Sequence, residues 1–516
     1  MNLRQNKKYR IFFIIPLFCC WLSPSSFAEK TNFLFFFVDD FGQMDLGVYG
    51  SKYHLTPNMD QLAKEGALFT EAYTDHPRCT PSRAALWTGK SAARLGQPGL
   101  PKGGIKGSEI TIAEAFKEGG YQTFFAGKWH VMGPDQLTPA QQGFDVNITG
   151  GHAGAPATHF YPYNNEKSKS KSKSKEKSKH NSGDHEAPIT GLEAYKDVFL
   201  GDALTEETIK YIRQRDKNKP FFATLAHYAV HTPLEGKPED VALYKERLKK
   251  MSYDKPEFTK EGFGQTQMRQ NNPVYAAMVH NVDQSLGKII KVLEEEDLAK
   301  NTVIVLSSDH GGLSTTSDSR QGSATTNFPF RAGKGWLYEG GTRVPFLIKW
   351  PGQVSGGLTI KTPVVLTDLY PTFLEMANLP CRPEQHIDGL SLVPLLKGGH
   401  LKDRNLYWHS PEPRPHSTGD FASSAIRCGN YKLVHWYRDN EIELFDLSKD
   451  LGEQNNLVHE MPEKAQKLMA DLNQWKRNVG ALVLDEQKLL HFWNRKESKN
   501  EDPKLNTYER KNIPKS

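Results

Sequence analysis

The sequence predicts an α/β fold with a mostly parallel central sheet covered by helices. Two observations support this prediction. Apolar, β-type runs alternate with helical patterns through most of the chain, as expected for repeated β-α units. Beyond about Leu401 the alternation stops, and short strands follow one another before a final helix, which indicates a smaller α+β subdomain.

The strands of the main sheet are expected at four apolar runs: 33–38 (FLFFFV), 122–126 (QTFFA), 221–225 (FFATL) and 302–306 (TVIVL). A further strand is expected at 344–349. In the subdomain, strands are expected at 425–427, 431–436 and 443–447. Most of these runs are rich in β-branched and aromatic residues, which pack well on a pleated sheet.

Three segments predict helices. Residues 57–65 (PNMDQLAKE) predict a short helix, because proline suits the first helical turn and Gly66 can end the helix. Residues 272–295 predict a long helix with one apolar face, formed by Ala276, Val279, Val282, Leu286 and Ile289. Residues 461–479 also follow a helical pattern.

The first residues of the chain read as a secretory signal. A basic start is followed by the apolar run 11–22 and by Ser26-Phe27-Ala28, which suits a cleavage site. The run is too short to span a bilayer well, and no later run is long enough. We therefore expect a signal peptide at 1–28, a catalytic domain at 29–400 and a subdomain with a tail at 401–516, in a soluble periplasmic or secreted protein without a membrane span.

The charge distribution bears on possible nucleic-acid or polyanion binding, and the cysteines bear on a possible disulfide. The net charge of +6 comes partly from the basic signal and from the Lys/Ser tract at 167–180, so it gives little support for nucleic-acid binding. That tract has nothing apolar to bury, which favours a solvated insertion loop over a role in holding a polyanion. Cys381 and Cys428 can pair in an oxidising compartment, but the sequence does not decide it.

Acidic residues follow two of the predicted strands. Asp39 and Asp40 end the first, and Asp309 and His310 end the last. Ligands of open α/β sheets bind beyond the carboxyl ends of the strands. Carboxylates that converge there repel one another unless a cation lies among them, and oxygen-rich ligation suits Ca²⁺ or Mg²⁺. Either pair alone can instead cap a neighbouring helix.

Further candidates for the site are basic. Lys128 and His130 follow the strand at 122–126 and are two residues apart, so they can share one face of an extended segment. His227 and His231 follow the strand at 221–225, and Lys334 lies in a glycine-rich segment. Taken alone, each has an ordinary explanation as an exposed lysine or a buried structural histidine.

The segment 79–83 (CTPSR), expected to be a turn and followed by Leu-Trp-Thr-Gly at 86–89, resembles the C-x-P-S-R signature of type I sulfatases. Other segments resemble motifs of the same family: 127–130 (GKWH), 231–233 (HTP) and 333–345 (GKGWLYEGGTRVP). The resemblance implies an alkaline-phosphatase-like fold, with a large mixed sheet flanked by helices and a smaller C-terminal α+β subdomain.

The resemblance also implies a role for each residue. A separate maturation enzyme would oxidise Cys79 to formylglycine (3-oxoalanine), whose hydrate is the nucleophile. Asp39, Asp40, Asp309 and His310, together with the modified Cys79, would bind Ca²⁺, with Mg²⁺ as the alternative. The roles of the remaining residues are as follows: Arg83 contacts the hydrate and anchors the carboxylates, Lys128 holds the hydrate and the sulfate, His130 takes a proton from the hydrate, His231 protonates the leaving alcohol and binds sulfate, and Lys334 binds sulfate.

The implied function is hydrolysis of sulfate esters on a sulfated carbohydrate. The segment 44–50 (MDLGVYG) is similar to that of exported bacterial enzymes acting on algal galactans or ulvan. Loops at 150–162 and 314–330 have the composition expected of sugar-reading loops. A phosphomonoester or phosphonate hydrolase of the same superfamily is one alternative, and a non-catalytic polyanion-binding surface protein is another.

Overall fold

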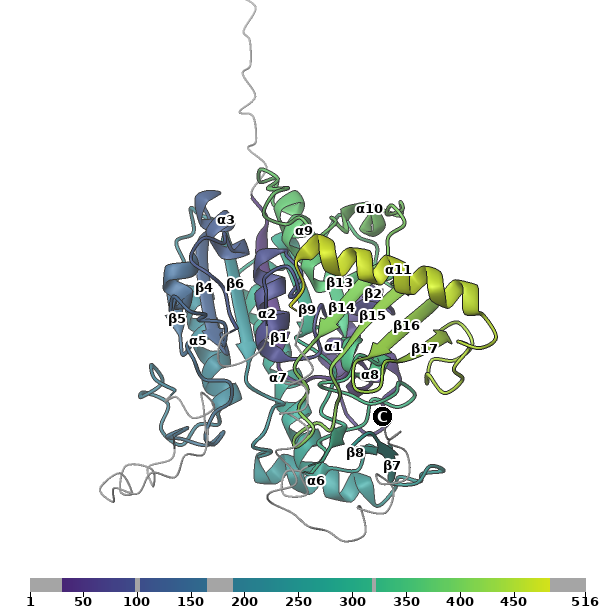
Figure 1. Ribbon diagram of the computed structural model, residues 1–516. Coiled ribbons are helices and arrows are strands. Elements are labelled where there is room, and N and C mark those ends of the chain that lie inside the picture. Colours follow the sequence, from purple (N-terminus) through teal and green to yellow (C-terminus); the bar gives the residue numbers. More distant parts are fainter. Residues whose placement is uncertain (1–29, 98–102, 165–188, 318–321, 483–516) are drawn as a thin grey trace, which may run out of the picture.

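The computed structural model describes residues 30–97, 103–164, 189–317 and 322–482 (Figure 1). The predicted signal peptide at 1–28 and the Lys/Ser tract at 167–180 lie outside the described residues, so both stay predictions. In the described part, every helix is too short or too polar to cross a bilayer. Cys381 and Cys428 are exposed and free rather than paired.

An eight-stranded mixed sheet forms the centre of the molecule, in the order β12-β2-β11-β9-β1-β6-β4-β5. Its strands are β1 (Asn32–Val38), β2 (Ala67–Phe69), β4 (Gln122–Gly127), β5 (Val146–Ile148), β6 (Phe221–His227), β9 (Thr302–Ser308), β11 (Phe346–Lys349) and β12 (Leu358–Ile360). β1 runs parallel to both β6 and β9, whereas β11 runs antiparallel to β9 and β2. The predicted α/β fold is confirmed, and the four predicted main strands all lie in this sheet.

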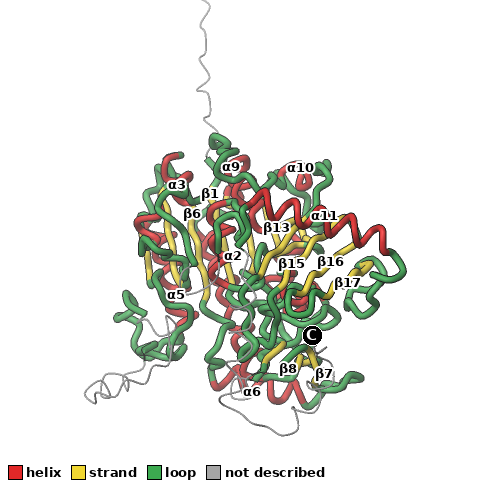
Figure 2. Tube along the Cα trace, viewed as in Figure 1, coloured by secondary structure: helices red, strands yellow, loops and turns green. Residues whose placement is uncertain are grey.

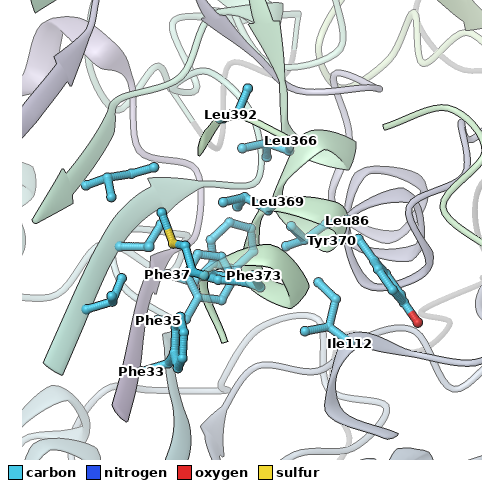
Figure 3. Packing of buried hydrophobic residues seen from close by; sticks show 14 of the residues in the cluster. Phe33, Phe35, Phe37, Leu86, Ile112, Leu366, Leu369, Tyr370, Phe373 and Leu392 are labelled. Carbon is cyan, nitrogen blue, oxygen red and sulfur yellow. The ribbon is translucent and has the colours of Figure 1, made fainter. Parts of the chain in front are cut away.

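Strand β1 shows why the sheet is covered on both faces. All seven of its residues are buried. Phe33, Phe35 and Phe37 enter one apolar core, and the alternate residues of the strand enter the other. In the first core these rings pack near Leu369 and Phe373 (Figure 3). Burying one such side chain contributes about 1.5–3 kcal/mol, so β1 anchors both layers.

Helices cover each face. One layer contains α2 (Cys79–Thr88), α3 (Ile112–Glu118) and α9 (Leu369–Met376), and the other contains α1 (Pro57–Glu65), α5 (Leu200–Gln214) and α7 (Pro273–Glu295). The described residues before the C-terminal sheet also form α6 (Pro238–Leu248), α8 (Glu339–Thr342) and α10 (Val393–Leu396). The predicted helix at 57–65 is confirmed, and the long predicted helix begins one residue later, because the Asn272 side chain caps it by accepting from the Val274 and Tyr275 amides.

Two small sheets lie beside the main one. One contains β7 (Phe258–Glu261), β8 (Gly264–Gln267) and β10 (Thr315–Thr316), and the other pairs β3 (Ala72–Tyr73) with β13 (Val364–Val365).

The C-terminal part is an antiparallel sheet with one helix on it (Figure 2). Its strands, in order, are β14 (Leu406–Ser410), β15 (Ser423–Cys428), β16 (Tyr431–Trp436) and β17 (Glu441–Asp446), followed by α11 (Pro462–Val479). One face of the sheet packs on Leu468 and Leu472 of α11. The other face packs on Tyr73, Trp336 and Tyr338 of the main body. This agrees with the predicted α+β subdomain, whereas its boundary at about residue 400 stays a prediction.

A buried ionic group joins the two parts. The Lys432 Nζ on β16 lies 2.8 Å from Glu339 Oε1 and 3.0 Å from Glu453 Oε1, and all three side chains are fully buried. Glu453 also accepts a hydrogen bond of 2.7 Å from the Glu339 amide. Glu339 begins α8, so the C-terminal sheet is fixed to the segment that precedes β11.

Candidate active site

The acidic pairs meet at the carboxyl edge of the main sheet, as the sequence predicted. β1 and β9 are neighbouring parallel strands with Val38 opposite Ser308, so Asp39 and Asp309 emerge side by side. The Asp40 amide donates to Asp309 Oδ1 at 3.2 Å. All the acids of this group are at most 2% exposed. Parallel pairing thus brings together carboxylates that lie far apart in the sequence.

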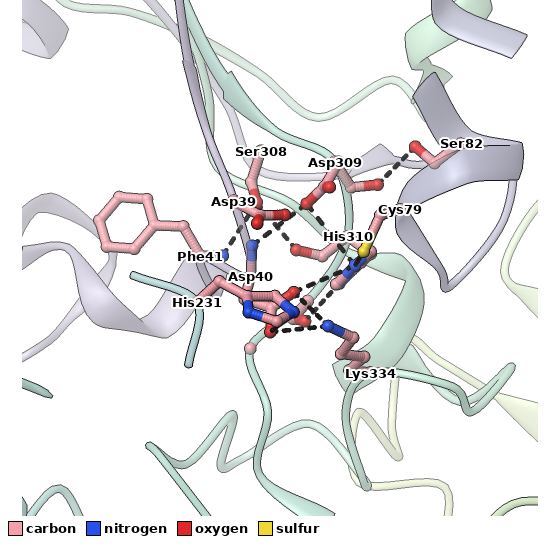
Figure 4. Close-up of polar contacts among 12 residues, drawn as sticks. Asp39, Asp40, Phe41, Cys79, Ser82, His231, Ser308, Asp309, His310 and Lys334 are labelled. Carbon is pink, nitrogen blue, oxygen red and sulfur yellow. Dashed lines mark hydrogen bonds and ion pairs between the residues drawn. The ribbon is translucent and has the colours of Figure 1, made fainter. Parts of the chain in front are cut away.

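Cys79 faces this acidic group from α2 (Figure 4). The segment 79–83 is the first turn of a buried helix rather than the expected turn, and proline at its third position is tolerated there because that amide has no partner in the helix. The Cys79 Sγ lies 3.4 Å from His310 Nε2. Ser82 ties the helix to the strand end by donating from Oγ to the Asp309 carbonyl at 2.5 Å.

Arg83 lies one helical turn after Cys79 and connects three segments. Its Nε donates to Asp309 Oδ2 at 2.9 Å, and its Nη2 donates to Asp39 Oδ1 at 3.3 Å. Its Nη1 donates to the Lys128 carbonyl at 2.7 Å. Because the side chain is 1% exposed, all of these bonds form away from water. Arg83 therefore fixes the carboxylates and the end of β4 relative to α2.

Lys128 and His130 enter the same site. Lys128 Nζ contacts Asp39 Oδ2 at 2.6 Å and is fully buried. His130 has a φ of +60°, and its ring lies close enough to the Cys79 side chain for the two groups to shift each other's pKa. Burial lowers the pKa of His130 to about 3, so its ring is neutral near neutral pH and can accept a proton.

Lys334 and His231 both lie beside Asp40. Lys334 Nζ lies 2.7 and 2.8 Å from the two Asp40 oxygens, and His231 Nε2 lies 3.8 Å from Asp40 Oδ2. Cys79, His231 and Lys334 are each 8% exposed, whereas Asp39, Lys128 and Asp309 are at 0%. The first three therefore line the open side of the site, where a substrate would enter.

The pKa values of the acids show how tightly their charges are coupled. Burial raises the pKa of Asp39 well above its ordinary value, and Lys128 opposes that shift. Burial also acts on Asp40 and Asp309, but nearby positive charge outweighs it and the pKa of each is lowered. The groups responsible are chiefly His231 and Lys334 for Asp40, and His310 and Arg83 for Asp309. The cluster is thus stable as carboxylates only with positive charge beside it.

The donor set can hold a divalent cation. Single ligand atoms of Asp39, Cys79, Asp309 and His310 all lie within 4.8 Å of one another. His310 Nδ1 donates to the Gly311 carbonyl at 3.0 Å, because a carbonyl oxygen can only accept. Burial by itself lowers the pKa of His310, but Asp309, Cys79 and Asp40 outweigh it and raise the pKa. When a cation displaces the second proton of His310, the lone pair of Nε2 points toward Asp40, 3.2 Å away, and toward Cys79. This is the tautomer that a metal-binding histidine requires.

Electrostatics also favour a thiolate at Cys79. Burial by itself raises the pKa of the thiol, but Lys128, Lys334 and His310 outweigh it and hold the pKa well below its usual range. The position is therefore one where positive side chains stabilise an anionic group.

Other residues named from the sequence lie around the site. His227 hydrogen-bonds with Ser285 Oγ at 3.0 Å on the face away from the acids, which fits the structural role expected of it. The loop at 150–162 touches the site: the Gly151 carbonyl accepts from the His130 amide at 3.0 Å. The loop at 314–330 is buried in part, and Asn327 supports the site by donating to the Gly312 carbonyl at 3.0 Å.

The sequence did not reveal that a loop of the C-terminal part contacts the residue directly before Cys79. Arg78, directly before Cys79, forms an ion pair with Asp420, which lies 342 positions later. Arg414 belongs to the same loop as Asp420. No motif signalled this pairing, since the loop is long, rich in proline and far away in the sequence.

The large mixed sheet with an antiparallel sheet packed beside it defines an alkaline-phosphatase-like hydrolase. The chain belongs to the sulfatase family, whose model matches residues 31–379, and is therefore a sulfuric ester hydrolase. A second model, for the C-terminal region of N-sulphoglucosamine sulphohydrolase, matches residues 331–482.

Individual proteins are similar over most of the chain. N-acetylgalactosamine-6-sulfatase of Canis lupus familiaris is 31% identical over 447 residues, which are 84% of this chain and 77% of the relative. A sulfatase of Formosa agariphila is 29% identical and covers 87% of this chain and 88% of its own length. The crystal structure of Ps i-CgsB in complex with k-i-k-neocarrahexaose has a TM-score of 0.70 and 29% identity, covering 92% of this chain and 99% of that one.

Proposed function

We propose that this sulfatase removes sulfate from a carbohydrate, with formylglycine at position 79 as the nucleophile and one divalent cation. The observation that carries the proposal is the place of Cys79, at the start of a buried helix and with its Sγ 3.4 Å from His310 Nε2 beside the acidic cluster. The Sγ atom marks the position that a hydrate oxygen of formylglycine would take. A maturation enzyme that oxidises Cys79 is thus a required partner.

The two hydroxyl groups of the formylglycine hydrate explain why Cys79 must be modified before the enzyme can act. One hydroxyl of the hydrate attacks sulfur and becomes sulfated, and the sugar oxygen leaves. The second hydroxyl then loses its proton, the bond between carbon and the sulfated oxygen breaks, and the aldehyde and free sulfate form. Water adds to the aldehyde and restores the hydrate. Cysteine and serine have no second hydroxyl, so neither can release sulfate in this way.

Two histidines handle the protons. His130, neutral and close to Cys79, is placed to take the proton from the second hydroxyl. His231 is placed to protonate the leaving sugar oxygen. Its Nδ1 donates to the Thr232 carbonyl at 2.7 Å, so the proton for the sugar must lie on Nε2, on the side that faces the site. Burial lowers the pKa of His231 to about 3, and the negative charge of a bound sulfate ester would raise it.

The cations stabilise the charge on sulfate. Lys128 and Lys334 lie on either side of the acidic pair at 39 and 40, and both have ammonium groups fixed by short contacts. Such preorganised positive charge stabilises a transition state without rearrangement. Asp39, Asp40, Asp309, His310 and residue 79 would hold Ca²⁺, or else Mg²⁺, which when bound would make the hydrate hydroxyl more acidic.

The carbohydrate substrate is inferred from the relatives and the sequence. One relative is named for N-acetylgalactosamine 6-sulfate, and one similar structure contains a neocarrahexaose. The segment 44–50 and the predicted export signal favour a periplasmic or secreted enzyme acting on fragments of an algal polysaccharide, such as a sulfated galactan or ulvan.

The experiment is a comparison of ester classes. We expect purified, matured protein to release sulfate from 4-nitrophenyl sulfate and from sulfated oligosaccharides, but to release little phosphate from 4-nitrophenyl phosphate. The Cys79→Ala variant should lose both sulfatase activities. Scoring a panel of sulfated oligosaccharides by the position desulfated would identify the sugar. Faster release of phosphate than of sulfate would contradict the proposal.

A further inference from the structure

The arginine directly before Cys79 has donors that nothing in the described structure satisfies. Arg78 is the N-cap residue of α2 and is 4% exposed. Its Nη2 pairs with Asp420, but its Nε and Nη1 are buried without a hydrogen-bond partner among the described residues. A buried guanidinium with two unpaired donors is costly, and a bound anion is one way to satisfy such donors.

The backbone amide of a second arginine, Arg414, contacts the same carboxylate. The Arg414 amide donates to Asp420 Oδ2 at 3.3 Å, the oxygen that Arg78 contacts. The Arg414 carbonyl accepts from the amides at 417, 418 and 419, which closes a tight turn around Asp420. The Arg78 charge is the largest cause that lowers the pKa of Arg414 to about 10, so the two guanidinium groups lie close together. The Arg78 guanidinium therefore pairs with Asp420, the Arg414 guanidinium lies nearby, and Glu412 is a further acid in the neighbourhood.

This arginine pair adjoins the sulfate side of the site. Gly335 follows Lys334, has a φ of +94°, and donates its amide to the Pro77 carbonyl at 2.8 Å. A Cβ atom at Gly335 would lie 2.7 Å from Asp420 Oδ1, so the loop that carries Asp420 packs directly on the loop that carries Lys334. The loop that carries Asp420 and Arg414 thus lies beside the segment that carries Lys334, and Arg78 directly precedes the nucleophile position.

We propose that Arg78 and Arg414 bind a second anionic group of the same substrate, a sulfate or carboxylate next to the ester that is cleaved. The planar fork of arginine matches such oxyanions with paired hydrogen bonds. The inference rests on the proposed function and deepens it: the preferred substrate is a sugar with two anionic groups. It also gives the C-terminal part a direct role in substrate choice.

The test compares matched oligosaccharides with the same backbone. One carries the reacting sulfate alone, one adds a second sulfate beside it, and one adds a carboxylate instead. The variants are Arg414→Met and Arg78→Lys, with Arg213→Met as a control that removes an arginine from the far end of α5. The measured quantity is the ratio of kcat/KM between each doubly anionic substrate and the singly sulfated one.

We expect the wild type to prefer one of the two doubly anionic substrates. The preferred substrate shows whether the second anionic group is a sulfate or a carboxylate. Arg414→Met should lower the preference about 10- to 100-fold, the value of a charged hydrogen bond, and Arg213→Met should leave it as in the wild type. As a second measurement, calorimetry on Cys79→Ala should show tighter binding of the same oligosaccharide than the Cys79→Ala/Arg414→Met variant. No preference in the wild type, or a preference kept by both variants, would overturn the second subsite while sulfate release continued. No sulfate release in any arm would overturn the proposed function and the subsite with it.

Discussion

Replacing Lys432 with methionine should weaken the junction between the two parts of the protein. Lys432→Met keeps the length of the side chain but removes the ammonium that lies between Glu339 and Glu453. Glu339 still contacts Arg343, whereas Glu453 loses its cation. Removing one partner of a buried ion pair costs about 3–5 kcal/mol, because a charge is left buried without compensation. We expect a loss of that size at pH 8.

The loss of stability in Lys432→Met should grow as pH rises toward 8, because Glu453 loses its proton over this range. Burial raises the pKa of Glu453 to about 7, with Lys432 opposing the shift. In the folded protein this carboxyl binds its proton more tightly than in the unfolded chain, so folding loses stability as pH rises from about 4.5 to 7. That penalty is about 3 kcal/mol in the wild type. Without Lys432 the pKa rises further, and the penalty continues to grow at higher pH.

Urea unfolding followed by tryptophan fluorescence measures this effect, since Trp408 and Trp436 are buried at the junction. The variant should resemble the wild type near pH 5 and unfold at clearly lower urea concentration at pH 8. Lys449→Met, at a lysine that is 83% exposed, is the control and should change stability by less than about 0.5 kcal/mol. Adding Glu453→Gln to Lys432→Met should restore part of the loss at pH 8. An equal loss at both pH values would refute the reasoning.

Three further outcomes are expected. Peptide mass spectrometry of active enzyme should find formylglycine at Cys79 as an aldehyde that a hydrazine traps, and an active preparation with only the thiol would contradict the mechanism. Elemental analysis should find one calcium or magnesium ion per chain, whereas two zinc ions per chain would indicate a phosphatase. Asp309→Ala should abolish turnover, because Asp309 belongs to the acidic cluster. Substitutions at exposed positions in the loop 150–162 should change which sulfated sugar is preferred, measured as a ratio to aryl sulfate turnover, whereas deleting residues 167–179 should leave that ratio unchanged. Loop variants that remain folded but lose aryl sulfate turnover would show that the loop does not act on the sugar alone.

The sequence predicted those features that depend on local patterns. The helix α1 and the strand β16 have the predicted bounds, because proline, glycine and the apolar runs mark their ends. The meeting of Asp39 with Asp309 was predictable because parallel neighbours present their carboxyl ends at one edge of a sheet. Lys128 and His130 enter one site, as their spacing suggested.

Features that depend on distant contacts were not predictable. The antiparallel direction of β11 and the contact between Lys432 and Glu339 arise from packing between segments that no local pattern connects. The segment 79–83 suggested a turn through its proline and serine, but burial of its helix overrides that preference. The composition of 314–330 suggested a loop that reads the sugar, but it did not reveal that Thr325 is buried and donates to Asp45.

The packing of Asp420 on Gly335 and of Lys432 on Glu339 bears on attempts to build chimeras of sulfatases. The matches to the two family models overlap at residues 331–379, the stretch that supplies Lys334, Gly335 and Glu339. A C-terminal sheet taken from another enzyme would meet this stretch with foreign side chains at both contacts. Exchange of substrate preference by swapping that sheet should therefore succeed only when the donor's version of residues 331–345 is transferred with it.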